Sequence, residues 1–240
     1  MNSPTNTKRV LICGSIAFDT IMVFEGRFKD QILPDQVHIL NVAFLVPSLR
    51  KDWGGCAGNI AYSLNMLGGK PVPMATIGHD AGGYFQRLQT LGIETSCLKQ
   101  IGEEFTAQAF ITTDLDDNQI TAFHPGAMSH SHLNKVSDAG DIALGIIAPD
   151  GRDGMMQHAE QFAAAGIPFV FDPGQGLPMF GKPELDRFLV RRRRRDVMLL
   201  FFSGPTKVRL FVVIVWRYLE HLGGTWASWR PGRRLGGKSC

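Results

Sequence analysis

The sequence predicts an α/β protein in which a parallel sheet lies between layers of helices, an α/β/α sandwich, with a small β-sheet attached as a lid. Short apolar runs typical of buried strands alternate with segments whose apolar residues recur at helical spacing. Glycines follow several of the helical segments, as a helix C-terminus often requires. Two further regions are rich in β-branched and aromatic residues, which favours a second sheet.

The parallel layer follows from its elements in chain order. The predicted strands are residues 10–13, 72–77, 144–149 and 167–171, and the predicted helices are residues 60–67, 80–91 and 154–165. We expect Asp80 to cap the second of these helices. Strand, helix and strand in alternation indicate right-handed βαβ units and therefore a parallel sheet.

The lid is predicted from two segments, about residues 22–52 and 97–123. Residues 37–46 favour a strand because β-branched residues dominate there. Residues 107–113 and 119–123 flank the polar residues 114–118, which predicts a hairpin. Phe110 and Phe123 lie on this hairpin. They either pack in a core or contact a ligand beneath the lid.

A glycine-rich turn leads into the first predicted helix. Gly54, Gly55 and Gly58 allow close approach of the backbone to a ligand, and the helix N-terminus offers free N–H groups. Asn59 adds a side chain that both donates and accepts hydrogen bonds. The combination suits a polyhydroxylated ligand such as a sugar. The alternative is a tight loop before an ordinary amphipathic helix.

Asp19 follows the first strand and is a second candidate for binding hydroxyl groups. A carboxylate that accepts hydroxyl hydrogen bonds gains about 1.5–3 kcal/mol for each charged bond. Its alternative role is to cap a helix or turn. Because ligands bind at the carboxyl ends of parallel strands, we expect residues 14–19, 54–59 and 172–176 to converge on one pocket.

The composition indicates a reducing environment and no membrane span. Cys13, Cys56, Cys97 and Cys240 show no metal-ligand or disulfide spacing, and no apolar run reaches about 18 residues. We therefore expect a cytoplasmic protein. Three histidines in the loop after the hairpin, His124, His130 and His132, are predicted to be surface residues, and no metal site is predicted.

Residues 54–83 also carry a family resemblance. Gly-Gly-x-x-Gly-Asn-x-Ala, a helix, Gly-Gly, a strand and Ile-Gly-x-Asp-x-x-Gly resemble the first signature of the ribokinase-like (PfkB) family of sugar and nucleoside kinases. The match holds residue types and separations over the whole segment. It is therefore far more specific than a lone glycine motif.

The resemblance implies an ATP-dependent kinase that uses Mg²⁺, with adenosine as the first choice of substrate. It implies that Asp19, Gly54, Gly55 and Asn59 hold the sugar and that Phe110 and Phe123 belong to a lid over it. Asp172 resembles the aspartate of an Asp-Pro turn that borders the substrate and phosphate region in this family. A homodimer through the lid is also expected.

The resemblance covers about residues 8–188 and then stops. Members of the family continue with a second signature, Asp-Thr-x-Gly-Ala-Gly-Asp, whose last aspartate is the catalytic base. Asp138-Ala-Gly-Asp141 matches only the end of that signature and lies too early in the chain. The sequence therefore predicts a C-terminally incomplete fold, and the catalytic base remains unidentified.

The tail differs from the rest of the chain. Residues 1–186 carry 12 Lys and Arg against 20 Asp and Glu, a net charge of −8, whereas residues 187–240 carry 13 against 2, a net charge of +11. Residues 191–195 are all arginine, and the apolar runs around them have no evident strand partner. One hypothesis is a frameshift near Leu189 that produced an anomalous tail over residues 189–240. The alternative is a genuine basic extension.

These two hypotheses lead to different functions. A frameshift leaves either a kinase that lacks its ATP site or a non-catalytic remnant that binds a sugar or nucleoside. A genuine extension favours binding of nucleic acid or an anionic membrane surface through the tail.

Overall fold

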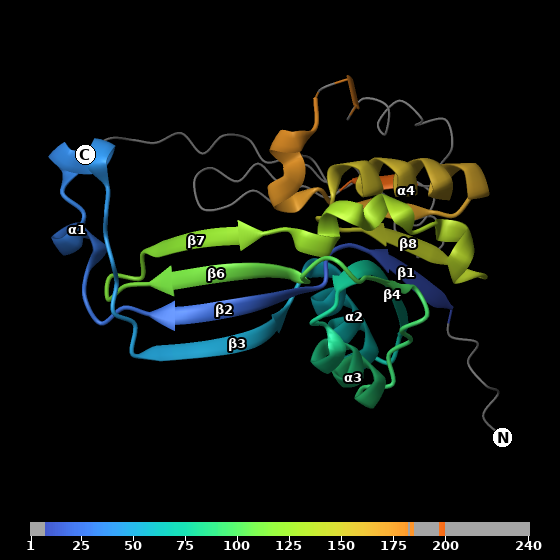
Figure 1. The fold of residues 1–240 in the computed structure, drawn as a ribbon. Coiled ribbons are helices and arrows are strands. Elements are labelled where there is room, and N and C mark those ends of the chain that lie inside the picture. The colour runs from blue at the N-terminus through green and yellow to red at the C-terminus, as the bar shows by residue number, and fades with distance from the viewer. Residues whose placement is uncertain (1–7, 182, 185–196, 200–240) are drawn as a thin grey trace, which may run out of the picture.

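The computed structural model describes residues 8–181, 183–184 and 197–199, and these residues form two sheets. A six-stranded parallel sheet with helices on both faces forms the body of the protein. A four-stranded mixed sheet, the lid, extends from one side of it (Figure 1). The predicted α/β class, with its parallel layer and smaller second sheet, is confirmed.

The six strands of the body run in the spatial order β10-β9-β8-β1-β4-β5, and every neighbouring pair is parallel. The strands are β1 (Arg9–Cys13), β4 (Lys70–Gly78), β5 (Leu98–Ile101), β8 (Leu144–Ile147), β9 (Phe169–Phe171) and β10 (Val197–Leu199). β1 lies near the centre, between β8 and β4, so its carboxyl end opens onto the middle of the sheet edge.

Helices cover both faces of this sheet. α2 (Cys56–Met66) and α3 (Gly82–Thr90) lie on one face, and α4 (Arg152–Ala165) lies on the other (Figure 1). The side chains of β1 alternate between two cores as a strand requires. Ile12 packs with Ala57 and Leu88 on the α2–α3 side, whereas Leu11 packs with Phe162 on the α4 side.

Short helices occupy several connections. They are α1 (Phe28–Gln31) and the 3-10 helices η1 (Pro34–Ile39), η2 (Gly126–Leu133), η3 (Val136–Ala139) and η4 (Gly174–Met179). In the described part of the chain, no helix is long and apolar enough to cross a membrane.

The lid sheet has the order β3-β2-β6-β7. Its strands are β2 (Ala17–Val23), β3 (Ser48–Gly54), β6 (Ala107–Thr113) and β7 (Gln119–His124). β2 pairs antiparallel with β3 and parallel with β6, and β6 and β7 form the predicted hairpin. The lid sheet therefore begins before the predicted segment 22–52, since most of β2 precedes it, and β5, inside the predicted segment 97–123, belongs to the body instead.

Three local predictions are wrong. The expected strand over residues 37–46 is replaced by the end of η1 and irregular chain. Asp80 does not cap α3, whose N-cap is Ala81, and instead accepts hydrogen bonds from the Thr106 amide (2.7 Å) and hydroxyl (2.6 Å). Within the tail, residues 197–199 do have a strand partner, β9. The remaining tail lies outside the described residues.

Candidate active site

The turn before α2 is built around Ser15, which follows β1. Gly55 has φ of +88°, and a Cβ at this position would lie 2.5 Å from the carbonyl oxygen of Ser15. The Cys56 N–H donates to the Ser15 hydroxyl (3.1 Å), and the Ala57 N–H donates to the Ser15 carbonyl oxygen (2.9 Å). The expectation that these helix-terminal N–H groups point freely toward a ligand is therefore wrong, because Ser15 already binds two of them.

Gly54 and Gly58 make room for side chains from other elements. A Cβ on Gly54 would lie 2.3 Å from Oδ2 of Asp19, so the carboxylate rests directly against this glycine. A Cβ on Gly58 would lie 2.0 Å from the hydroxyl of Tyr84 on α3, which donates to the Gly54 carbonyl oxygen (2.8 Å). The motif thus brings β2, β3, α2 and α3 together.

Asp19 lies within β2 rather than beyond a strand end. It accepts no hydrogen bond from any other residue that the structure describes, so no capping role is evident there. Burial, together with the nearby charge of Asp52, raises the pKa of this carboxyl. A partly buried carboxylate without a protein donor is suited to accept hydrogen bonds from ligand hydroxyls.

Three carboxylates act electrostatically on Cys56 in the first turn of α2. Burial raises the pKa of the Cys56 thiol, and the charges of Asp172, Asp150 and Asp19 raise it further, while a hydrogen bond with Ser15 opposes them. Asp19 and Asp172, which are far apart in the sequence, therefore both act on the thiol at the start of α2. Residues 14–19 and 54–59 do contact each other, whereas their convergence with residues 172–176 on one pocket stays a prediction.

Asp150 was not singled out from the sequence. It lies just after β8, is 4% exposed, and accepts a hydrogen bond from the Gly151 N–H (2.8 Å). Burial raises the pKa of Asp150 to about 8, although the hydrogen bonds that its carboxylate accepts act to lower the pKa. The rule that drew attention to Asp172, a carboxylate at the carboxyl end of a parallel strand, would also have found Asp150.

The side chains of Asn59 and Asp172 differ in their hydrogen bonding within the protein. The Asn59 side chain is exposed and forms no hydrogen bond within the described residues, so it is available to a ligand. Asp172 follows β9 and accepts a hydrogen bond from the Gly174 N–H (3.0 Å), which fixes its orientation. Burial raises the pKa of Asp172, with this hydrogen bond acting in the opposite sense.

The strand register separates the two lid phenylalanines. Asp19 pairs with Ala109, and Ala109 pairs with Phe123, so Asp19 and Phe123 lie on the same face of the lid sheet. Phe110 pairs with Thr20 and lies on the opposite face. The expectation that both rings contact one ligand beneath the lid is therefore not met in this arrangement, and Phe123 is the better placed of the two.

Metal ligands are not grouped in the described residues: no three His, Cys, Asp or Glu side chains lie together as a metal site. Among the loop histidines, Nε2 of His130 lies 3.3 Å from Oε1 of Glu104. The rings of His130 and His132 have centroids 6.3 Å apart.

A parallel α/β body with a β lid, whose inner face carries a carboxylate beside a glycine turn, defines the ribokinase-like class. The profile of the pfkB family carbohydrate kinases matches residues 18–171. The chain belongs to this family.

Individual relatives are sugar and nucleoside kinases. The nucleoside kinase of Methanocaldococcus jannaschii is 37% identical over 149 residues, which cover 60% of this chain and 48% of the relative. A fructokinase of Solanum tuberosum is 28% identical over 176 residues, covering 68% of this chain and 54% of the relative. The chain thus spans about half the length of the curated relatives it matches.

A solved structure shares the fold at higher identity. The structure of Burkholderia thailandensis nucleoside kinase in complex with inosine matches with a TM-score of 0.68 and 45% identity, covering 81% of this chain and 70% of that chain.

Proposed function

We propose that this chain carries the acceptor-binding part of a kinase that phosphorylates a hydroxyl group of a nucleoside or sugar. The observation that carries this proposal is Asp19, a partly buried carboxylate that accepts no hydrogen bond from the described residues and rests against the Gly54–Gly55 turn. Carboxylate oxygens that accept from two neighbouring hydroxyls would hold and orient a ribose or related sugar. Asn59, one turn into α2, would supply further donors and acceptors.

A purine nucleoside is the substrate class we propose, with adenosine converted to AMP as the first candidate. Support comes from nucleoside kinases among the relatives and from the related structure that contains inosine. Phe123, on the same face of the lid as Asp19 and 52% exposed, offers an aromatic surface for a base. Asp172 would lie at the border between the acceptor and the phosphate.

The donor side of the reaction rests on family membership. We propose ATP as the phosphate donor and Mg²⁺ as its counter-ion, because phosphoryl transfer depends on positioning and charge neutralisation. The described residues provide neither a grouped metal site nor an identified catalytic base, so they do not establish a fit to these groups. We also propose a cytoplasmic location, consistent with Cys13, Cys56 and Cys97 being free thiols.

Titration calorimetry tests the acceptor site directly. The full chain should bind adenosine or inosine more tightly than ribose. Asp19→Asn and Asn59→Ala should each weaken that binding, Asp19→Asn by about tenfold or more, since one charged hydrogen bond is worth about 1.5–3 kcal/mol. Ser63→Ala, an exposed position on the same helix, is the matched control and should bind as the unaltered chain does.

The same experiment separates two versions of the proposal. If nucleoside and ATP both bind, and phosphate transfer to the nucleoside is seen, the chain is a kinase in its present form. If nucleoside binds and ATP does not, it is a non-catalytic binding remnant. Equal affinity in the Asp19 and Asn59 variants would contradict the proposed acceptor site.

A second candidate function depends on the tail. The net charge of +11 over residues 187–240 favours nucleic acid or an anionic membrane surface as a partner. Such binding should weaken steeply with added salt. Removal of residues 189–240 should abolish it, and retention of binding by the shortened chain would exclude this function.

We further propose a homodimer formed through the lid. The lid face opposite Asp19 presents Leu49, Phe110 and Ile120, which are 65%, 41% and 44% exposed. Sedimentation of the full chain would show a dimer that Phe110→Ser weakens. A monomer at all concentrations would contradict it.

A further inference from the structure

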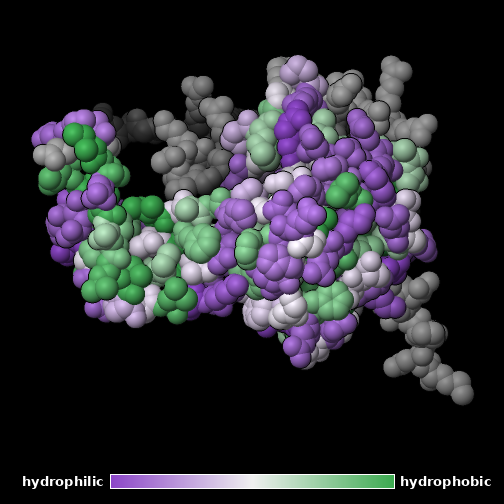
Figure 2. All heavy atoms as spheres, in the orientation of Figure 1, coloured by the Kyte–Doolittle hydropathy of each residue, from purple (hydrophilic) through white to green (hydrophobic). Residues whose placement is uncertain are grey.

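A long connection at the far end of the lid, which we call the strap, comprises residues 24–47. It leaves the end of β2 and returns at the start of β3, beyond the β6–β7 turn (Figure 1). Several of its large apolar side chains are exposed, and apolar side chains gather at this end of the molecule in Figure 2. These residues are Leu33 (55%), Ile39 (73%), Leu40 (55%) and Leu45 (86%).

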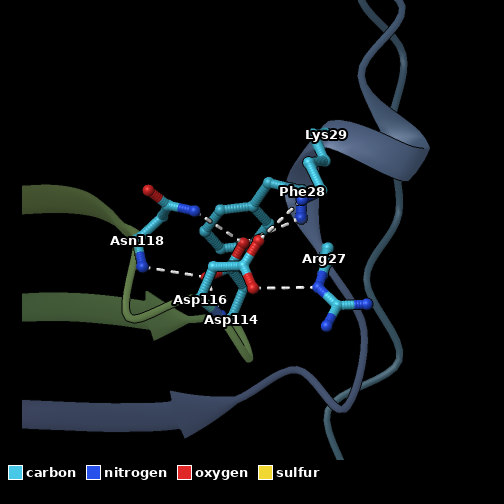
Figure 3. Close-up of polar contacts among 6 residues, drawn as sticks. All are labelled: Arg27, Phe28, Lys29, Asp114, Asp116 and Asn118. Carbon is cyan, nitrogen blue, oxygen red and sulfur yellow. Dashed lines mark hydrogen bonds and ion pairs between the residues drawn. The ribbon is translucent and has the colours of Figure 1, made fainter.

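Asp114, at the start of the β6–β7 turn, joins this turn to the strap (Figure 3). Its Oδ1 accepts from the N–H groups of Asp116 (3.0 Å) and Asn118 (2.8 Å), which holds the turn. Its Oδ2 accepts from the Phe28 N–H of the strap (2.9 Å) and from Nδ2 of Asn118 (3.0 Å). Oδ1 thus binds only the turn, whereas Oδ2 binds both the turn and the strap.

The carboxylate is held in its charged form. Although burial opposes it, hydrogen bonds from Asn118, Phe28 and Asp116 lower the pKa of Asp114 to about 2. The side chain is only 5% exposed, so these donors replace the water it would otherwise bind. The junction is therefore intact over the whole range in which proteins normally work.

Further contacts strengthen the same junction. Arg27 and Lys29 of the strap form ion pairs with Asp116 of the turn, at 2.8 and 3.0 Å (Figure 3). Backbone hydrogen bonds run in both directions, from Leu115 N to Gly26 O (3.0 Å) and from Phe24 N to Thr113 O (2.9 Å).

The strap also closes on itself through three aromatic rings. Phe44, near its return to β3, packs against Phe24 and Phe28 near its start, with ring centroids 4.9 Å apart in both cases. Phe24 and Phe28 stack with centroids 6.0 Å apart. Phe28 is the junction between this cluster and Asp114, because its N–H donates to the carboxylate while its ring lies in the cluster.

We propose that Asp114 is a positioning residue that fastens the strap to the lid hairpin, so that strap and hairpin respond to a ligand at the acceptor site as one unit. The strap's two ends are β2 and β3, and the opposite ends of these strands carry Asp19 and the Gly54–Gly55 turn. A ligand held at Asp19 therefore shares two strands with the strap. The coupling to ligand rests on the proposed acceptor site, whereas the junction itself does not.

Asp114→Asn separates the two roles of the carboxylate. The amide keeps one oxygen for the turn and places an NH₂ group where Oδ2 accepted from Phe28 and Asn118, so the strap loses its partner. Asp117→Asn is the matched control. Asp117 lies in the same turn, is exposed, and has φ of 59°, a conformation that asparagine tolerates.

Hydrogen exchange of the full chain without ligand tests the junction. In Asp114→Asn, amides of residues 24–32 should exchange about tenfold faster or more, the value expected for one lost charged hydrogen bond. Exchange in the body and in Asp117→Asn should be unchanged. If the strap of Asp114→Asn exchanges as in the control, Asp114 does not fasten it and the proposal fails.

Added inosine tests the coupling. In the unaltered chain and in Asp117→Asn, inosine should protect residues 24–47 and 107–124 together. In Asp114→Asn it should still protect the hairpin while the strap remains unprotected, a difference that mere destabilisation of the fold would not produce. Protection of the hairpin alone in the unaltered chain would overturn the coupling. If inosine and adenosine protect nothing, the proposed acceptor site fails, and the ligand-free exchange still decides the role of Asp114.

Discussion

Each glycine of the Gly54–Gly55 and Gly58 motif is required by a different neighbour. Asp19 occupies the space beside Gly54, Gly55 has positive φ above the Ser15 carbonyl, and Tyr84 occupies the space beside Gly58. The motif's first effect is therefore internal: it lets two polar side chains and one backbone segment approach α2. That packing holds Asp19 in place, as the proposed acceptor site requires.

Gly58→Ala should destabilise the protein. The added methyl group would lie 2.0 Å from the Tyr84 hydroxyl and would displace it from the Gly54 carbonyl. Overpacking of this kind costs about 1–3 kcal/mol, and the lost buried hydrogen bond adds to it. Urea unfolding, compared at the midpoint and slope, measures the change.

Two further variants test the cause. Gly82→Ala places a methyl group where nothing lies within 4 Å and should be neutral or slightly stabilising. The double variant Gly58→Ala with Tyr84→Phe removes the hydroxyl that meets the methyl group, so it should recover part of the loss. Equal destabilisation in the single and double variants would show that the Tyr84 hydroxyl is not the cause.

Asp150 should make stability fall as the pH rises. Burial raises its pKa to about 8 in the folded protein, from an ordinary value of 3.8, so the folded state keeps a proton that the unfolded state has lost. Between about pH 4 and pH 8 the unfolding free energy should therefore decrease by up to about 1.4 kcal/mol per pH unit from this group. Asp150→Asn removes that contribution. The difference in unfolding free energy between the variant and the unaltered chain should grow with pH, and a constant difference would contradict the assignment.

At the level of elements, Ser15 acts as the cap of a helix that begins 41 residues later. Its hydroxyl binds the Cys56 N–H and its carbonyl oxygen binds the Ala57 N–H, so the carboxyl end of β1 is fixed to the start of α2. Ser15→Ala should cost about 0.5–2 kcal/mol, as loss of an N-cap side chain does. Thermal or urea unfolding measures it, with Ser63→Ala as the control. A change as small as that of the control would mean that water replaces the hydroxyl.

The predicted helices and most strands of the body could be read from the sequence because local signals agree with tertiary packing there. The region 37–46 shows the opposite case: its β-branched residues favour a strand, but none of the described strands pairs with it at the lid tip. β-propensity expresses packing against a partner strand, so it fails where that partner is missing. For the same reason, the short strand at Val197–Leu199 was not predicted, since only β9 reveals it.

The site was predictable in its residue types and not in its register. Asp19, Asn59 and the glycines remain predicted site residues, and Asp19, expected after a strand end, lies within β2. That Phe123 shares a face with Asp19 while Phe110 does not depends on the pairing of β2 with β6, about 90 residues apart. A shift of one residue would exchange the two faces, and the sequence does not fix that register locally.

At the scale of the whole molecule, the two sheets position different residues. The body encloses two cores, one on each face of the parallel sheet, and fixes Ser15, Asp150 and Asp172 at its strand ends. The lid carries Asp19 at its base and the strap at its tip. Lid and body meet at the Gly54–Gly55 turn, so a ligand in the proposed acceptor site would contact both. The division into body and lid does not account for the contrast in net charge between residues 1–186 and residues 187–240.

The tail composition predicts an altered reading frame. The family's second signature is missing where it is expected, and residues 189–240 combine a run of five arginines with Trp, Arg and Gly in a nearly acid-free segment. Such composition arises when a GC-rich coding sequence is translated out of frame. Resequencing the coding DNA from codon 180 onward, with translation of all three frames, tests this. A second frame that continues into strands, helices and an Asp-x-x-Gly-x-Gly-Asp motif is the expected result, and it would assign the catalytic base to that frame. A confirmed frame with no such continuation would make the tail genuine, and the salt-dependent binding partner would become the first function to pursue.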